Sequence, residues 1–145
     1  MRRTAIAVGV AAGIGLAAAS APAATALSAL HITVSPLKPK PGAPVTAKVT
    51  NATPRAKYYC ILTLHKAGVS ANAKSAFVPS LVHVTASSRG TMTCHEVFLP
   101  FSGTFQGKRH YCPPRAADKR AGWGCAVTII NVKNYNQHVY GDFKF

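Results

Sequence analysis

Residues 58–64, with the sequence YYCILTL, form the most strand-like stretch of this 145-residue chain. Aromatic and β-branched side chains predominate there, and these residue types favour extended backbone in a sheet. Upstream, residues 45–50 (VTAKVT) alternate apolar and polar side chains, which predicts a strand with one face in solvent. Downstream, residues 126–132 (AVTIINV) form an apolar run that predicts another strand. We therefore expect a fold built on β-strands.

The segments around these three add short strands and loops. Residues 36–44 contain four prolines and residues 113–124 are polar and basic, so both are expected to be loops. Residues 75–84 fit either a helical turn or a strand, because Pro79 interrupts both. Further extended segments are expected at residues 31–34, 91–98, 101–108 and 139–145. Roughly six or seven strands, with at most one or two short helices, predict antiparallel sheet.

Residues 1–29 are expected to be a secretory signal peptide, and residues 30–145 a single disulfide-bonded domain. Two arginines precede an uncharged, apolar stretch at residues 5–19, and small residues follow, so that Ala26 and Ala29 both fit a cleavage site. The apolar stretch is shorter than the ~20 residues that a membrane-spanning helix needs. The mature chain is therefore expected to be secreted, with no transmembrane segment.

Cysteine usage agrees with export. The chain has four cysteines, Cys60, Cys94, Cys112 and Cys125. An even number in an exported chain indicates two disulfides, and the spacing alone leaves all three pairings open. No C-x-x-C pair is present, so zinc and redox motifs are not indicated, and we expect neither a metal nor another cofactor.

The charge is strongly one-sided. Lys and Arg number 17 against three acids, which gives a formal net charge of +14. Such a field favours anionic partners, among them nucleic acid, wall polymers and membrane surfaces. The cations are scattered along the sequence, however, so the charge also fits a role in solubility alone. Five tyrosines would allow base stacking, but aromatic residues in strands more often pack in a core.

The pattern of acids and histidines does not indicate catalysis. Of the three acids, only Glu96 lies outside an expected loop or terminus, so a hydrolase with paired carboxylates is disfavoured. His95 and Glu96 are adjacent, so on a strand they point to opposite faces and cannot hold one ion together. A nuclease would require His95, His110 and Arg109 to converge with Glu96. We expect a protein that is not an enzyme.

Residues 93–100 (TCHEVFLP) are the most distinctive segment. Cys94 and Pro100 bracket five residues that we expect to be extended, and Glu96 lies among them. A disulfide fixes one end of such a segment and proline fixes φ at the other. This pattern fits a stiffened, exposed strand, and it also fits an ordinary strand bonded by a structural disulfide.

Several short segments then agree with one family in their order along the chain. The most specific is QGKR at residues 106–109 after an aromatic residue, and the separation of Cys94 from Pro100 also matches. The matching segments are residues 28–34 (SALHITV), 55–60 (RAKYYC), 94–100 (CHEVFLP), 103–109 (GTFQGKR) and 143–145 (FKF). The chain resembles the bacterial subtilisin-inhibitor-like family of secreted serine-protease inhibitors.

The resemblance implies an α+β fold in which β-structure dominates: an antiparallel sheet of about five strands with one or two short helices, usually in a homodimer. It implies inhibition by a rigid substrate-like loop whose scissile bond is Glu96–Val97. A glutamate at that position implies a Glu-selective extracellular serine protease as the partner. The residues of the reactive loop would be Cys94, His95, Glu96, Val97, Phe98 and Pro100.

The same resemblance implies a disulfide between Cys94 and Cys125, which leaves Cys60 and Cys112 as the second pair. The alternative prediction is a cationic extracellular module that binds anionic envelope polymers or nucleic acid, on an immunoglobulin-like β-sandwich. A bond between Cys60 and Cys94 would favour such a sandwich with a buried bridge.

Overall fold

The computed structural model of this chain describes residues 29–68 and 81–145. The signal peptide expected at residues 1–29 therefore lies almost wholly outside the described residues, and so does the first part of the ambiguous segment 75–84. The elements are β1 (His31–Ser35), β2 (Pro44–Thr50), β3 (Lys57–Lys66), β4 (Leu81–Thr85), β5 (Met92–Val97), β6 (Phe101–Phe105), β7 (Lys108–Cys112), α1 (Ala116–Arg120), β8 (Trp123–Asn131) and β9 (His138–Asp142).

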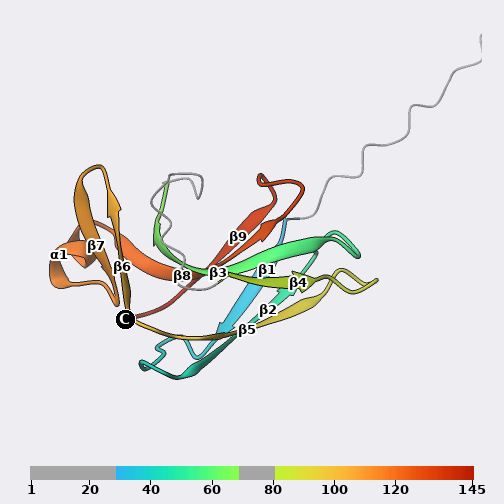
Figure 1. Cartoon of the computed structure of the whole chain (residues 1–145), viewed down its shortest axis with the longest axis horizontal. Helices are drawn as coiled ribbons and strands as arrows, with labels where there is room; N and C mark the ends of the chain where they lie inside the picture. The colour runs from blue at the N-terminus through green and yellow to red at the C-terminus, as the bar shows by residue number, and fades with distance from the viewer. Residues whose placement is uncertain (1–28, 69–80) are drawn as a thin grey trace, which may run out of the picture.

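The strands form two packed sheets and a separate ribbon. A three-stranded sheet has the order β1-β2-β5, a four-stranded sheet has the order β4-β3-β8-β9, and β6 pairs with β7 alone. Every pairing is antiparallel. The expectation of a mainly antiparallel β-protein is confirmed. The strands are divided between two layers, however, and do not form one sheet of about five strands (Figure 1).

The core lies between the two sheets, and the sequence pattern explains why. In β2, Val45, Ala47 and Val49 are buried while the residues between them are more exposed, as the alternation of apolar and polar residues predicted. Strand β3 differs, because residues 60–64 are buried on both faces. It is a central strand of its sheet, and a run that is apolar except for Thr63 suits a strand that is covered on both sides.

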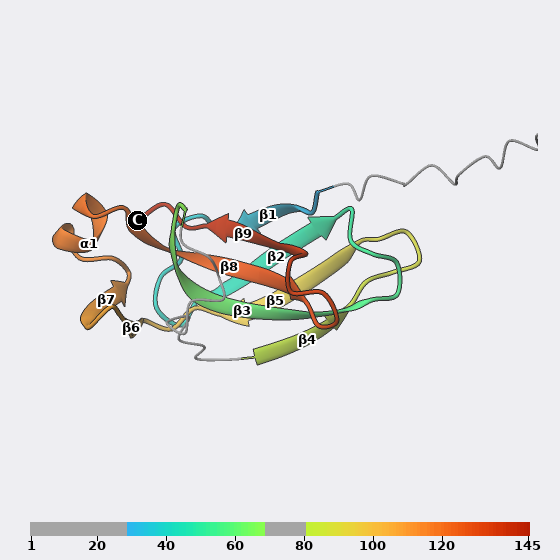
Figure 2. The same cartoon turned by 90° about the horizontal axis from the view of Figure 1, so that it is seen from above.

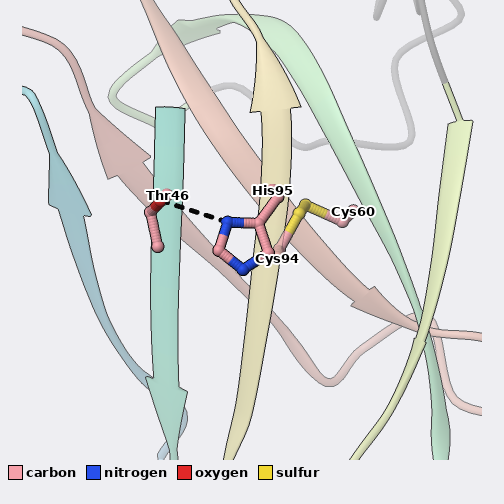
Figure 3. The surroundings of a disulfide bond; sticks show 4 residues. All are labelled: Thr46, Cys60, Cys94 and His95. Atoms are coloured by element: carbon pink, nitrogen blue, oxygen red, sulfur yellow. Dashed lines mark hydrogen bonds between the residues drawn. A yellow bond between two sulfur atoms is a disulfide. The ribbon is translucent and has the colours of Figure 1, made fainter. Parts of the chain in front are cut away.

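The two disulfides pair the four cysteines differently from the pairing that the resemblance implied. Cys60 on β3 is bonded to Cys94 on β5, which joins the two sheets through the core, with 6.4 Å between their Cα atoms (Figure 3). Cys112 at the end of β7 is bonded to Cys125 on β8. The pairing of Cys94 with Cys125 is therefore wrong. Cys94 points into the core from the three-stranded sheet and is bonded to Cys60, while Cys125 on β8 is bonded to Cys112 of the ribbon.

The ribbon and α1 lie together at one end of the molecule (Figures 1 and 2). The sequence predicted one extended stretch at residues 101–108, whereas the chain reverses at Gln106 and Gly107. Both have positive φ, 48° and 76°, which is typical of the tight turn of a β-hairpin. The expected loop at residues 113–124 contains α1. Within residues 29–68 and 81–145, no helix is long and apolar enough to cross a membrane.

Candidate functional site

The segment expected to be a reactive loop is instead a paired strand. Residues 92–97 form β5, which is hydrogen-bonded to β2 along its length. Cys94 and Glu96 point into the sandwich, and Glu96 is only 7% exposed. His95 and Val97 point outward. The prediction of Glu96 on a protruding loop is wrong, because side chains alternate along the paired strand β5 and Glu96 therefore faces the same way as Cys94, which is bonded to Cys60 in the core.

The residues that follow β5 are also held against the body of the protein. Phe98 is fully buried, and its ring packs edge-on against Phe143 with 5.5 Å between ring centroids. Its backbone N–H donates to the Ala43 carbonyl at 2.9 Å, and its carbonyl accepts from the Gly42 N–H at 2.8 Å. Pro100 is exposed. The exposed apolar residues on either side of Phe98 therefore lie on a segment whose position is fixed by these contacts of Phe98.

The histidines considered for a nuclease are not brought together. His95 lies on the outer side of the three-stranded sheet, where its Nδ1 is 3.2 Å from Thr46 Oγ1 (Figure 3). His110 is buried on the ribbon. Ligand atoms of Glu96, Cys60 and Cys94 lie within 4.8 Å of one another, but disulfide sulfurs are not thiolates. This group therefore lacks the donors of a thiolate metal site.

A set of contacts that the sequence did not reveal ties the ribbon to α1 and to the four-stranded sheet. His110 Nδ1 on β7 lies 2.9 Å from Asp118 Oδ1 on α1, and both side chains are buried. The backbone N–H of Arg115 donates to Asp118 Oδ2 at 3.3 Å. The His110 ring also stacks on Trp123 of β8, with 4.2 Å between centroids. Together with the Cys112–Cys125 bond, these contacts make a rigid support.

Exposed cations gather on that support. The ribbon–helix surface, as we call it, consists of Lys108, Arg109, Arg115, Lys119 and Arg120, all of which are exposed. The acid within residues 108–120 is Asp118, whose carboxylate is buried and already bound. The Arg115 guanidinium lies over the Tyr111 ring, 3.4 Å from its centroid. The cations that looked scattered in the sequence therefore include a group of five at one end of the fold.

A cleft of about 450 Å³ opens beside this surface. His65 Nδ1 on β3 and Asp142 Oδ1 on β9 meet at 2.5 Å across the intervening strand β8, and both residues line the cleft. The His65 ring stacks on Tyr140 at 4.0 Å. The remaining lining residues are Ala67, Pro114, Lys119, Gly122, Trp123, Gly124, Phe143, Lys144 and Phe145. The cleft thus combines aromatic side chains with two lysines.

Part of this site could have been found from the sequence. A polar residue followed by glycine at positions 106–107, between two extended segments, is a hairpin signal. That hairpin would have placed the ribbon, and with it Lys108 and Arg109. An acid three residues after Arg115 is a common feature of a helix start. The stacking of His110 on Trp123 carries no such local signal.

Comparison with known proteins gives a fold likeness and no family. No family model matches the chain, and no curated protein sequence matches it. Among solved structures, macromomycin is similar to this chain, with a TM-score of 0.55 and 18% identity over 81% of this chain and 99% of macromomycin. At that identity, the likeness concerns the fold alone. This similarity gives no support to the resemblance to the subtilisin-inhibitor-like family.

Proposed function

We propose that this chain is an exported binding protein that attaches to anionic polymers of the cell envelope through the ribbon–helix surface. The observation that carries the proposal is the group of five exposed cations within residues 108–120, beside which the local acid is buried and bound. Two disulfides are consistent with an extracellular protein. Export from the cell and attachment to polymers are both parts of this proposal.

The rigidity of the support favours binding. A cationic side chain on a fixed backbone loses less conformational freedom on contact with a polymer than one on a loose loop. The Cys112–Cys125 bond and the contact of His110 with Asp118 hold β7 and α1 in place. The Arg115 guanidinium lies over the Tyr111 ring, and this contact restricts its movement. Arginine in a fixed orientation suits phosphate and carboxylate groups, because it can donate two parallel hydrogen bonds.

The aromatic residues favour recognition of charge over recognition of bases. A single-strand binder needs aromatic faces on which bases stack. Tyr58 is fully buried, one face of Tyr111 is covered by Arg115, and the Tyr140 ring is stacked by His65. Tyr135 is half-exposed, but it lies between β8 and β9, at the end of β8 that is remote from the ribbon. An envelope polymer therefore fits this surface better than a nucleic acid.

The experiment compares polymers of matched length at one salt concentration. Poly(glycerol phosphate), oligothymidylate and a neutral glucan are titrated against the protein, with affinity measured by calorimetry. We expect poly(glycerol phosphate) to bind at least as tightly per phosphate as oligothymidylate, and the glucan not to bind. Tighter binding of oligothymidylate would point to nucleic acid. Equal binding of the glucan would remove the electrostatic proposal altogether.

Protease inhibition at the Glu96–Val97 bond has weaker support and stays a prediction of the resemblance. A protease would have to reach a side chain that is 7% exposed on a strand paired with β2. The disulfide from Cys94 to Cys60 opposes the necessary movement of β5 away from the core. A homodimer also stays a prediction.

A further inference from the structure

We propose that the cleft between α1 and the C-terminal residues is a binding site for a small amphipathic carboxylate, a ligand with an aryl or alkyl body and one anionic group. This inference goes beyond polymer attachment, because it concerns a concave site for a small molecule. It shares only Lys119 with the ribbon–helix surface. It is argued from the lining of the cleft, its size and its charge.

The apolar part of the cleft is fixed by contacts on its far side. Trp123 is stacked on His110, and Phe105 lies against it with 5.3 Å between ring centroids. Phe143 packs on Phe98 and on Phe145 in the core. These contacts favour the positions in which the side chains line the cleft. A volume of about 450 Å³ lies within the range of small-molecule sites, which are commonly lined by aromatic side chains.

The charged part of the cleft favours an anion. Lys119 of α1 and Lys144, just after β9, are both exposed and both line the cleft. The carboxylate in the lining belongs to Asp142, which accepts a hydrogen bond from His65 at 2.5 Å. The two lysine side chains thus outnumber the one acidic side chain among the lining residues. The backbone of Lys144 is itself fixed, because its N–H donates to the Leu37 carbonyl at 2.7 Å.

The apolar part and the charged part of the cleft together define the class of ligand. A wholly apolar ligand would leave the two lysines without a counter-charge. A small inorganic anion would make no use of the apolar part of the lining, in which Trp123 and Phe143 are each 7% exposed. A ligand with both features satisfies both parts, because apolar burial and a charge-assisted hydrogen bond then act together. Arylalkyl carboxylates are the simplest probes of this class.

The test titrates 4-phenylbutyrate and its neutral analogue 4-phenylbutyramide into the isotopically labelled protein. The chain has one tryptophan, so its indole N–H signal is assigned without ambiguity, and Trp123 lines the cleft. We expect a saturable shift of that signal and of the Gly122 and Gly124 amides. The carboxylate should bind about tenfold more tightly than the amide, because only the carboxylate can accept charge-assisted hydrogen bonds from the two lysines as an anion.

Two double variants distinguish the effect of charge in the cleft on affinity from the effect of charge elsewhere on the protein. The double variant Lys119→Gln with Lys144→Gln should lower the affinity for 4-phenylbutyrate about tenfold. It should change the affinity for 4-phenylbutyramide by less than about twofold. The matched control is Lys57→Gln with Lys133→Gln, at the other end of β8, where the Val132 N–H donates to the Lys57 carbonyl. The control should change neither ligand.

Three results would overturn the proposal. The first is an absence of any saturable shift of Trp123 at millimolar probe. The second is equal affinity for the carboxylate and the amide. The third is an equal loss of affinity in the cleft variant and in the control. Polymer attachment is unaffected by any of them, because Lys108, Arg109 and Arg120 do not line the cleft.

Discussion

Replacing Asp118 with alanine removes the carboxylate that joins the ribbon to α1. His110 Nδ1 then loses its partner at 2.9 Å, and the Arg115 N–H loses its acceptor at 3.3 Å. The Asp118 side chain is 8% exposed and that of His110 10%, so water does not readily replace the lost bonds. A buried donor left without an acceptor costs about 1–3 kcal/mol, and two affected donors suggest a loss of about 3 kcal/mol in the free energy of unfolding.

The chain offers a matched control in its second pair of histidine and aspartate. Asp142 contacts His65 through the same two atom types, but its side chain is 58% exposed. Ion pairs that solvent can reach contribute about 0–1 kcal/mol, so Asp142→Ala should cost less than about 1 kcal/mol. Asp118→Asn keeps an acceptor oxygen and should recover part of the loss. Each variant removes one negative charge, so the change in net charge is the same.

The assay is urea unfolding at constant pH with both disulfides intact, followed by the fluorescence of Trp123. Because Trp123 stacks on His110, its emission reports on the ribbon support directly. Hydrogen exchange at the α1 amides provides a second, local measurement, and Asp118→Ala should remove their protection. Equal destabilisation by Asp118→Ala and Asp142→Ala, or a loss below about 1 kcal/mol for the former, would refute the reasoning from burial.

Three further predictions concern the core. Peptide mapping of the unreduced protein should recover Cys60 linked to Cys94, and replacing both with alanine should cost about 2–5 kcal/mol in urea unfolding; a Cys94 peptide linked elsewhere would contradict the sandwich. Gly90→Ala should lower stability by about 2 kcal/mol or more, since Gly90 has a φ of +70° and an added Cβ would collide with the Ala52 carbonyl oxygen; unchanged thermal unfolding would count against this close approach of Gly90 to Ala52. Glu96→Lys should destabilise the protein by several kcal/mol and should not create a protease inhibitor, because it places an ammonium group at a buried position; tight inhibition of a trypsin-like protease by a folded variant would restore the reactive-loop hypothesis.

The strands could largely be predicted from the sequence, because their signals are local. Residues 45–50 and residues 58–64 are both strands, as predicted, and residues 45–50 also have the predicted alternation of buried and exposed side chains. The division into two sheets depends on which strands pair across long separations. Residues 45–50 pair with residues near 95 rather than with the neighbouring β3, and no local pattern specifies that choice.

The candidate site could be predicted less well than the strands. The number of disulfides followed from the cysteine count, but their pairing depended on the layers, and the resemblance placed Cys94 with the wrong partner. The cations at residues 108–120 form a group only because the chain turns at Gln106 and Gly107 and then folds into α1. The cleft joins residues from β3, β8 and the C-terminus, which are far apart in sequence.

The salt dependence of polymer binding tests the ribbon–helix surface most directly. Three neutralising substitutions there, Lys108→Gln, Arg109→Gln and Arg120→Gln, are compared with three of the same kind at the opposite end, Lys57→Gln, Arg55→Gln and Arg89→Gln. For a flexible polyanion such as poly(glycerol phosphate), each lost contact should reduce the slope of log K against log salt by about 0.7. We predict a slope about 2 units shallower for the first variant and an unchanged slope for the second. Equal slopes for the two variants would contradict attachment through this surface.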